Sequence, residues 1–60
     1  MNSTDVVNVA RHLFQAEGAG AIAEVAREIE ACTRNGDSER AMFWTRVEAV
    51  LQEMRGARQT

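Results

Sequence analysis

The sequence predicts an all-α protein made of three helices, at about 4–17, 20–35 and 38–55. Apolar residues recur in each segment at the spacing of one helix face, which is the main sequence signal for amphipathic helices. The chain has no Pro, and its four Gly residues fall between the segments or after the last one. We therefore expect an antiparallel helical hairpin at 20–55 preceded by an N-terminal helix, in a single domain of residues 1–60 whose end, 56–60, is a frayed tail.

The first helix is expected to begin near Ser3, Thr4 or Asp5, because these side chains can accept hydrogen bonds from the unpaired N–H groups of a first turn. Its apolar face has four central residues and two at the edges: Val6, Ala10, Leu13 and Phe14, with Val7 and Val9 beside them. Gly18 suits the left-handed position that follows many helices. The valines lower the helix propensity, so a short early strand stays an alternative.

The second helix is expected to place an apolar stripe opposite a charged face. The stripe consists of Ile22, Val25, Ala26, Ile29, Cys32 and Thr33. Asn35 or Gly36 then suits the left-handed position after the helix, and Asp37 suits the N-cap of the next one. A connection this short predicts that the second and third helices lie roughly antiparallel.

The third helix contains two features of interest, an apolar face and a stripe of small residues. The apolar face is expected to centre on Phe43, Val47, Val50 and Met54, with Trp44 and Leu51 on one flank. The stripe lies opposite this face and consists of Ala41, Thr45 and Ala49, with Met42 alongside. Small residues let another helix approach closely, and Met adapts to irregular contacts. An ordinary solvated helix face would also explain the stripe.

The length of the chain limits how it can be stabilised. A domain of 60 residues buries only about 60% of the surface that its unfolded chain exposes. Chains this short usually need disulfides, a metal or a partner subunit. One Cys and one His leave no internal disulfide and no zinc site. Self-association is the remaining route.

The charge and the terminal sequence bear on location and partners. The formal net charge is −2, which argues against nucleic acid or an anionic membrane as the main partner. No segment approaches the roughly 18 consecutive apolar residues of a membrane span, and the N-terminus lacks the pattern of a signal peptide. With no disulfide framework, we expect a cytoplasmic protein. All seven basic residues are Arg beside ten Ala, which suggests a GC-rich bacterial source.

No set of residues resembles a catalytic, cofactor-binding or metal site. His12 has no nearby nucleophile, and the carboxylates of the second helix are typical of a solvated face. We therefore expect a protein that is not an enzyme, binds no cofactor, and either forms a homodimer or binds a protein partner. The candidate interface residues are Phe14, Met42, Phe43, Trp44, Thr45, Val47, Ala49 and Leu51.

A DNA-binding regulator is the alternative function. A helix–turn–helix needs Arg, Asn, Gln or Ser near the start of an exposed recognition helix. Ser38, Arg40 and Arg46 supply some of these groups, but Glu39 and Glu48 dilute the positive charge. In this alternative an antitoxin-like dimer would contact DNA.

The chain also resembles a group of small helical proteins of alphaproteobacteria. The residues that carry the resemblance are Gly18, Ala21, Gly36, Asp37, Trp44, Val47 and Leu51. They give a helix, a Gly-containing turn, an Ala-rich helix, Gly-Asp and a Trp-containing helix, over most of the chain. Members often open the first turn with His-Gly, where this chain has Glu17-Gly18. The resemblance implies an all-helical fold and no particular activity.

Overall fold

A computed structural model describes residues 3–56, and three helices account for nearly all of this range. They are α1 (Ser3–Glu17), α2 (Gly20–Arg34) and α3 (Ser38–Gly56). The all-α prediction is confirmed, and the predicted helix bounds agree to within one residue. Within the expected tail, Gly56 is the last residue of α3, and 57–60 lie outside the described residues.

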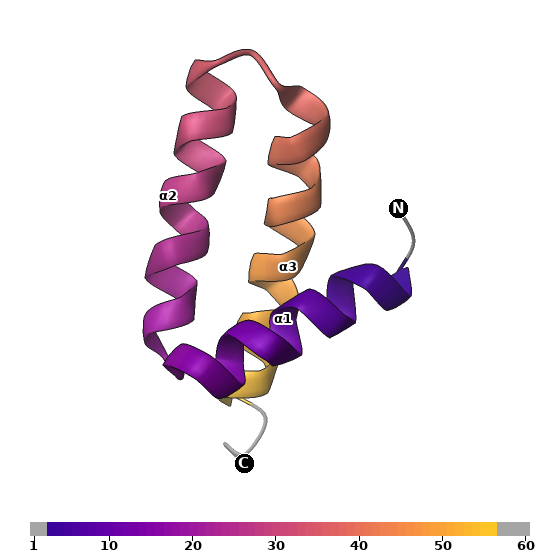
Figure 1. Cartoon of the computed structure of the whole chain (residues 1–60), viewed down its shortest axis with the longest axis vertical. Helices are drawn as coiled ribbons and strands as arrows, with labels where there is room; N and C mark the ends of the chain where they lie inside the picture. The colour runs from indigo at the N-terminus through magenta and orange to yellow at the C-terminus, as the bar shows by residue number, and fades with distance from the viewer. Residues whose placement is uncertain (1–2, 57–60) are drawn as a thin grey trace.

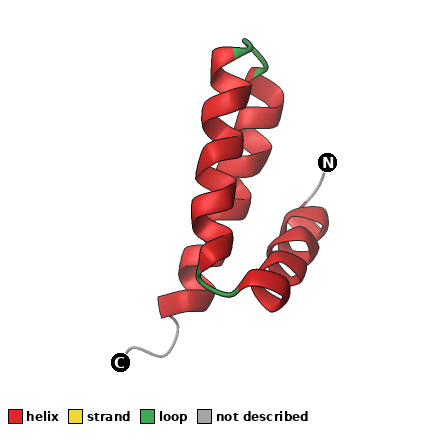
Figure 2. Cartoon of the chain, turned by 60° about the vertical axis from the view of Figure 1, so that its left-hand side comes forward, coloured by secondary structure: helices red, strands yellow, loops and turns green. Residues whose placement is uncertain are grey.

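The helices α2 and α3 form an antiparallel hairpin, and α1 crosses it near the end opposite the connecting turn (Figure 1). A second view shows α1 to one side of the hairpin (Figure 2), and Val6 near its start is buried in the core. The most extensive contact joins α2 to α3, followed by α1 with α3, and α1 touches α2 least. The first helix therefore packs on its own hairpin, mainly on α3, a question that the sequence left open.

The turn between α2 and α3 is closed by two backbone hydrogen bonds of a Schellman motif. The amide of Asp37 donates to the carbonyl of Cys32 at 2.8 Å, and the amide of Gly36 donates to the carbonyl of Thr33 at 3.1 Å. Gly36 has a φ of 78°, whereas Asn35 is right-handed with a φ of −86°. The left-handed residue predicted for this turn is therefore Gly36.

Asp37 also begins α3, as the sequence predicts. Its Oδ1 accepts a hydrogen bond of 3.2 Å from the amide of Arg40, the geometry of an N-cap that satisfies one free donor of the first turn. One residue thus ends α2 through its backbone amide and starts α3 through its carboxylate.

The link between α1 and α2 is a simpler turn. Gly18 has a φ of 59°, as predicted, and its amide donates to the carbonyl of Phe14 at 2.8 Å. The N-cap predicted at Ser3, Thr4 or Asp5 stays a prediction, because Ser3 is the first described residue of the chain and of α1.

The core is small and receives residues from all three helices. Its buried members are Val6, Ala10, Ala21, Val25, Val47 and Leu51, and Cys32 is buried on α2 as a free thiol. The largest fully buried side chains are Leu51, Val25 and Val47. No aromatic side chain is fully buried within residues 5–56.

The buried faces predicted for α2 and α3 are rotated from the observed ones by part of a helical turn. On α2, Ala26 and Thr33 are exposed, whereas Ala21, which is absent from the predicted stripe, is fully buried. On α3, Leu51 lies at the centre with Val47, while Phe43, Val50 and Met54 are only partly buried. Apolar residues surround much of α3, so periodicity alone does not identify which of them will face α1 and α2.

Replacing Gly36 by Ala should lower the free energy of unfolding by about 1–2 kcal/mol, because an L side chain strains the left-handed backbone. Gly20→Ala is the matched control, since Gly20 lacks a positive φ and a Cβ at either site meets nothing within 4 Å. The control should leave stability unchanged or raise it by up to about 1 kcal/mol. Urea unfolding followed by circular dichroism measures both, and equal effects would contradict the backbone explanation.

Asp37→Ala should lower the free energy of unfolding by about 1 kcal/mol, because it removes the acceptor for the Arg40 amide. Asp37→Asn keeps an oxygen acceptor and should retain most of the stability. Thermal melting of the three proteins tests the N-cap. If the Asn and Ala variants melt at the same temperature, the side-chain hydrogen bond does not stabilise the hairpin.

Candidate functional site

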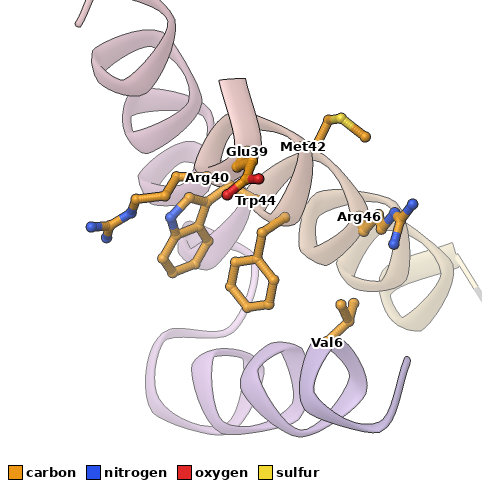
Figure 3. Close-up of a pocket in the computed structure, with 7 residues that line it drawn as sticks. Val6, Glu39, Arg40, Met42, Trp44 and Arg46 are labelled. Carbon is orange, nitrogen blue, oxygen red and sulfur yellow. The ribbon is translucent and has the colours of Figure 1, made fainter. Parts of the chain in front are cut away.

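A groove lies between α1 and the N-terminal half of α3 (Figure 3). Its volume is about 530 Å³. The residues that line it, which define the α1–α3 groove, are Val6, Glu39, Arg40, Met42, Phe43, Trp44 and Arg46. All but Val6 come from the first half of α3. The groove exists because α1 crosses α3 nearer its C-terminal end and leaves this part of α3 uncovered (Figure 1).

Apolar side chains dominate the lining of the α1–α3 groove. Among the described residues, Met42 is the large hydrophobic residue that is exposed, with 57% of its surface open to solvent. Phe43 and Trp44 are partly buried and pack against the core, and Val6 belongs to the core itself. Figure 3 shows Met42 pointing away from Val6 and α1. The groove is therefore an extension of the core that opens to solvent.

The two aromatic rings of the groove contact each other. The ring centroids of Phe43 and Trp44 lie 5.3 Å apart, with an angle of 72° between the ring planes. This edge-to-face geometry contributes about 0.5–1.5 kcal/mol beyond the burial of the rings. The contact holds both rings in place, so the wall of the groove is preformed.

The indole nitrogen of Trp44 is buried without a hydrogen-bond acceptor among the described residues. An unpaired buried donor costs about 1–3 kcal/mol. Arg40 precedes Trp44 by one helical turn, but its guanidinium carries only donors and cannot satisfy the indole. Trp44 thus occupies its position for packing and without the polar contact that buried Trp usually makes.

The charged residues that line the groove have both signs. Glu39, Arg40 and Arg46 are all exposed. Glu39 lies in the first turn of α3, where its negative charge also interacts favourably with the helix dipole. An apolar surface flanked by both signs of charge is typical of protein–protein contacts.

The structure brings together three of the predicted interface residues, Met42, Phe43 and Trp44. Val47 and Leu51 have no exposed surface, because they form the centre of the chain's own core, and they cannot reach a partner. Phe14 is partly buried against the core and does not line the groove.

The stripe of small residues lies outside the α1–α3 groove. Thr45 and Ala49 are exposed, and Ala41 is partly buried. The hydroxyl of Thr45 donates to the carbonyl of Ala41 at 2.7 Å, so it is satisfied within α3. The exposure predicted for Met42, Thr45 and Ala49 is confirmed, but only Met42 takes part in the groove.

Four residues that line the groove are absent from the predicted interface: Val6, Glu39, Arg40 and Arg46. Val6 was assigned to the core, where it also belongs, and its place beside α3 depends on how α1 crosses the hairpin. Glu39 and Arg46 could have been found from their spacing. They lie seven residues apart, on the same helix face as Met42 and Phe43.

Within residues 3–56, no group of three or more His, Cys, Asp or Glu side chains is placed to hold a metal ion. Over the same range, no helix has the length and hydropathy that crossing a membrane requires. No protein-family model, curated protein or solved structure matches the chain. Function is therefore best judged from the geometry of the groove.

Trp44→Phe should change the free energy of unfolding by less than about 1 kcal/mol, because it removes the unpaired N–H and keeps an aromatic ring. Trp44→Ala should lower it by about 2–3 kcal/mol, somewhat less than for a fully buried aromatic. Urea unfolding followed by far-UV circular dichroism compares the two variants. A Phe variant as unstable as the Ala variant would show that the indole N–H forms a stabilising contact.

Proposed function

We propose that the protein acts by contact with another protein chain, in the first instance as a homodimer, and that it is not an enzyme. The observation that supports this proposal is the position of the large apolar side chains. The core holds nothing larger than Leu51, whereas Phe43 and Trp44 are half-buried beside the exposed Met42. Clustered aromatic and Met side chains with charged neighbours are the usual composition of an interface core and its rim.

The size of the chain favours self-association. A chain of 60 residues with a core of Val, Ala and Leu side chains buries little apolar surface. That burial offsets the conformational entropy lost on folding only narrowly. A second copy that covered the groove would add burial of the largest side chains in the chain. Folding and association would then stabilise each other.

The charges around the groove favour a protein partner over nucleic acid. A DNA-binding surface needs a concentration of basic residues to contact phosphates. Here Glu39 lies beside Arg40, and the chain carries a net charge of −2. A helix–turn–helix also sets its helices at about 90–120° to each other, whereas α2 and α3 run antiparallel side by side (Figure 1).

A bacterial cytoplasm is part of the proposal. The use of Arg without Lys, beside ten Ala, supports a GC-rich bacterial source, as does the resemblance to small alphaproteobacterial helical proteins. The single Cys is buried as a free thiol, which suits a reducing compartment. Expression of the native gene with fractionation of the host would locate the protein directly.

Sedimentation at increasing protein concentration should show a monomer–dimer equilibrium. Met42→Glu should weaken the dimer at least about tenfold, because it would place a carboxylate in the apolar contact. Ala31→Glu adds the same charge on the exposed face of α2 and should leave the dimer unchanged. Circular dichroism should show that both variants keep their helix content.

Two results would contradict the proposed dimer. A wild-type chain that stays monomeric up to millimolar concentration, with cooperative unfolding, would exclude self-association. A dimer that Met42→Glu and Ala31→Glu affect equally would place the contact on another face of the molecule.

A further inference from the structure

We propose that the second copy docks with its α3 antiparallel to the α3 of the first, about a two-fold axis between Met42 and Phe43. Glu39 of each chain then pairs with Arg46 of the other. This inference rests on the homodimer proposed above and specifies its orientation and register.

The first argument is the spacing of four residues along α3. Glu39, Met42, Phe43 and Arg46 follow the i, i+3, i+4, i+7 pattern of a single helix face. The two apolar residues lie at the centre of this seam and the two charges at its ends. The seam is therefore symmetric in position and opposite in charge about a point between Met42 and Phe43.

The second argument is that the two charges are available to a partner. Seven residues of helix span about 10.5 Å, which is too far for Glu39 and Arg46 to pair within one α3. Within residues 3–56 the structure records no ion pair or hydrogen bond for either side chain, and both residues are exposed. Their charges can form new pairs without breaking existing ones.

Symmetry then selects the orientation. In a two-fold dimer, if one residue contacts a second on the partner, the second contacts the first. An antiparallel arrangement centred between Met42 and Phe43 forms the Glu39–Arg46 pair twice. A parallel arrangement would instead place Glu39 against Glu39 and Arg46 against Arg46, which is repulsive.

Two other antiparallel registers are less favourable. Centring the axis on Arg46 brings the two Arg46 side chains together and sets Glu39 against Glu53. Centring it between Ala49 and Val50 would pair Arg46 with Glu53. However, α1 crosses α3 near that end and would obstruct a second copy there (Figure 1).

The α1–α3 groove accounts for the apolar centre of the dimer. Met42 is exposed next to the proposed axis and has a flexible side chain that adapts to irregular cavities. The groove beside it has a volume of about 530 Å³, with Val6 and Trp44 among its lining residues. We infer that Met42 of each chain enters the groove of the other, so that each copy closes the opening in its partner's core.

Charge reversal tests this orientation. Glu39→Arg alone and Arg46→Glu alone should each weaken the dimer about 30-fold, since two attractive pairs become repulsive. The double variant should associate as the wild type does. An equimolar mixture of the two single variants should form a heterodimer of wild-type affinity, since all four charges are then complementary. Analytical ultracentrifugation measures each case.

The control pair is Glu28→Arg and Arg27→Glu, which make the same charge changes on the exposed face of α2. They should leave the dimer unchanged, alone or mixed. Glu39→Arg also removes a favourable charge from the first turn of α3. If that variant does not fold, Met42→Cys in a Cys32→Ala background replaces it. Two Met42→Cys chains should form a disulfide under mild oxidation, and Thr45→Cys chains should not.

The outcomes separate this inference from the proposed function. A wild-type dimer that neither reversal weakens, or Met42→Cys chains that do not cross-link, would overturn the register and leave self-association intact. An equimolar mixture of the two single variants that associates more strongly than the wild type, with neither variant weakened alone, would overturn the antiparallel orientation, because only parallel helices set like charges together in the wild type and opposite charges together in the mixture. A wild-type chain that is monomeric at every concentration would overturn both proposals.

Discussion

The fold depends most on the way Asp37 joins α2 to α3. Its backbone amide closes the Schellman motif onto Cys32, and its carboxylate accepts the amide of Arg40 in the next helix. These bonds fix the direction and the rotation of α3 relative to α2. That rotation turns Val47 and Leu51 inward, and it leaves the Glu39–Arg46 side of α3 for α1 or another chain to cover.

Local chemistry made much of this fold predictable. The helix ends follow from glycines that can adopt positive φ and from Asp37 as an N-cap, signals that depend on a few neighbouring residues. The same holds for the antiparallel hairpin, because a short connection leaves few other arrangements.

The candidate site was less predictable because it depends on tertiary packing. Apolar residues surround much of α3, so the sequence treated Leu51 as a flank and as an interface residue, although it is the centre of the core. The groove itself requires the crossing point of α1, which no local pattern encodes. Met42 was correctly predicted to be exposed, because it lies alongside the stripe of Ala41, Thr45 and Ala49, opposite the predicted apolar face of α3.

The arrangement of contacts also has a consequence for the order of folding. The α2–α3 hairpin joins segments that are close in sequence, so closing its short turn loses little chain entropy. The contacts of Val6 and Ala10 with Val47 and Leu51 join opposite ends of the chain and form only after a much longer loop has closed. We therefore expect the hairpin to form first and α1 to dock last. During that interval the side of α3 that α1 later covers is open, so a second chain could meet it before its own α1 does.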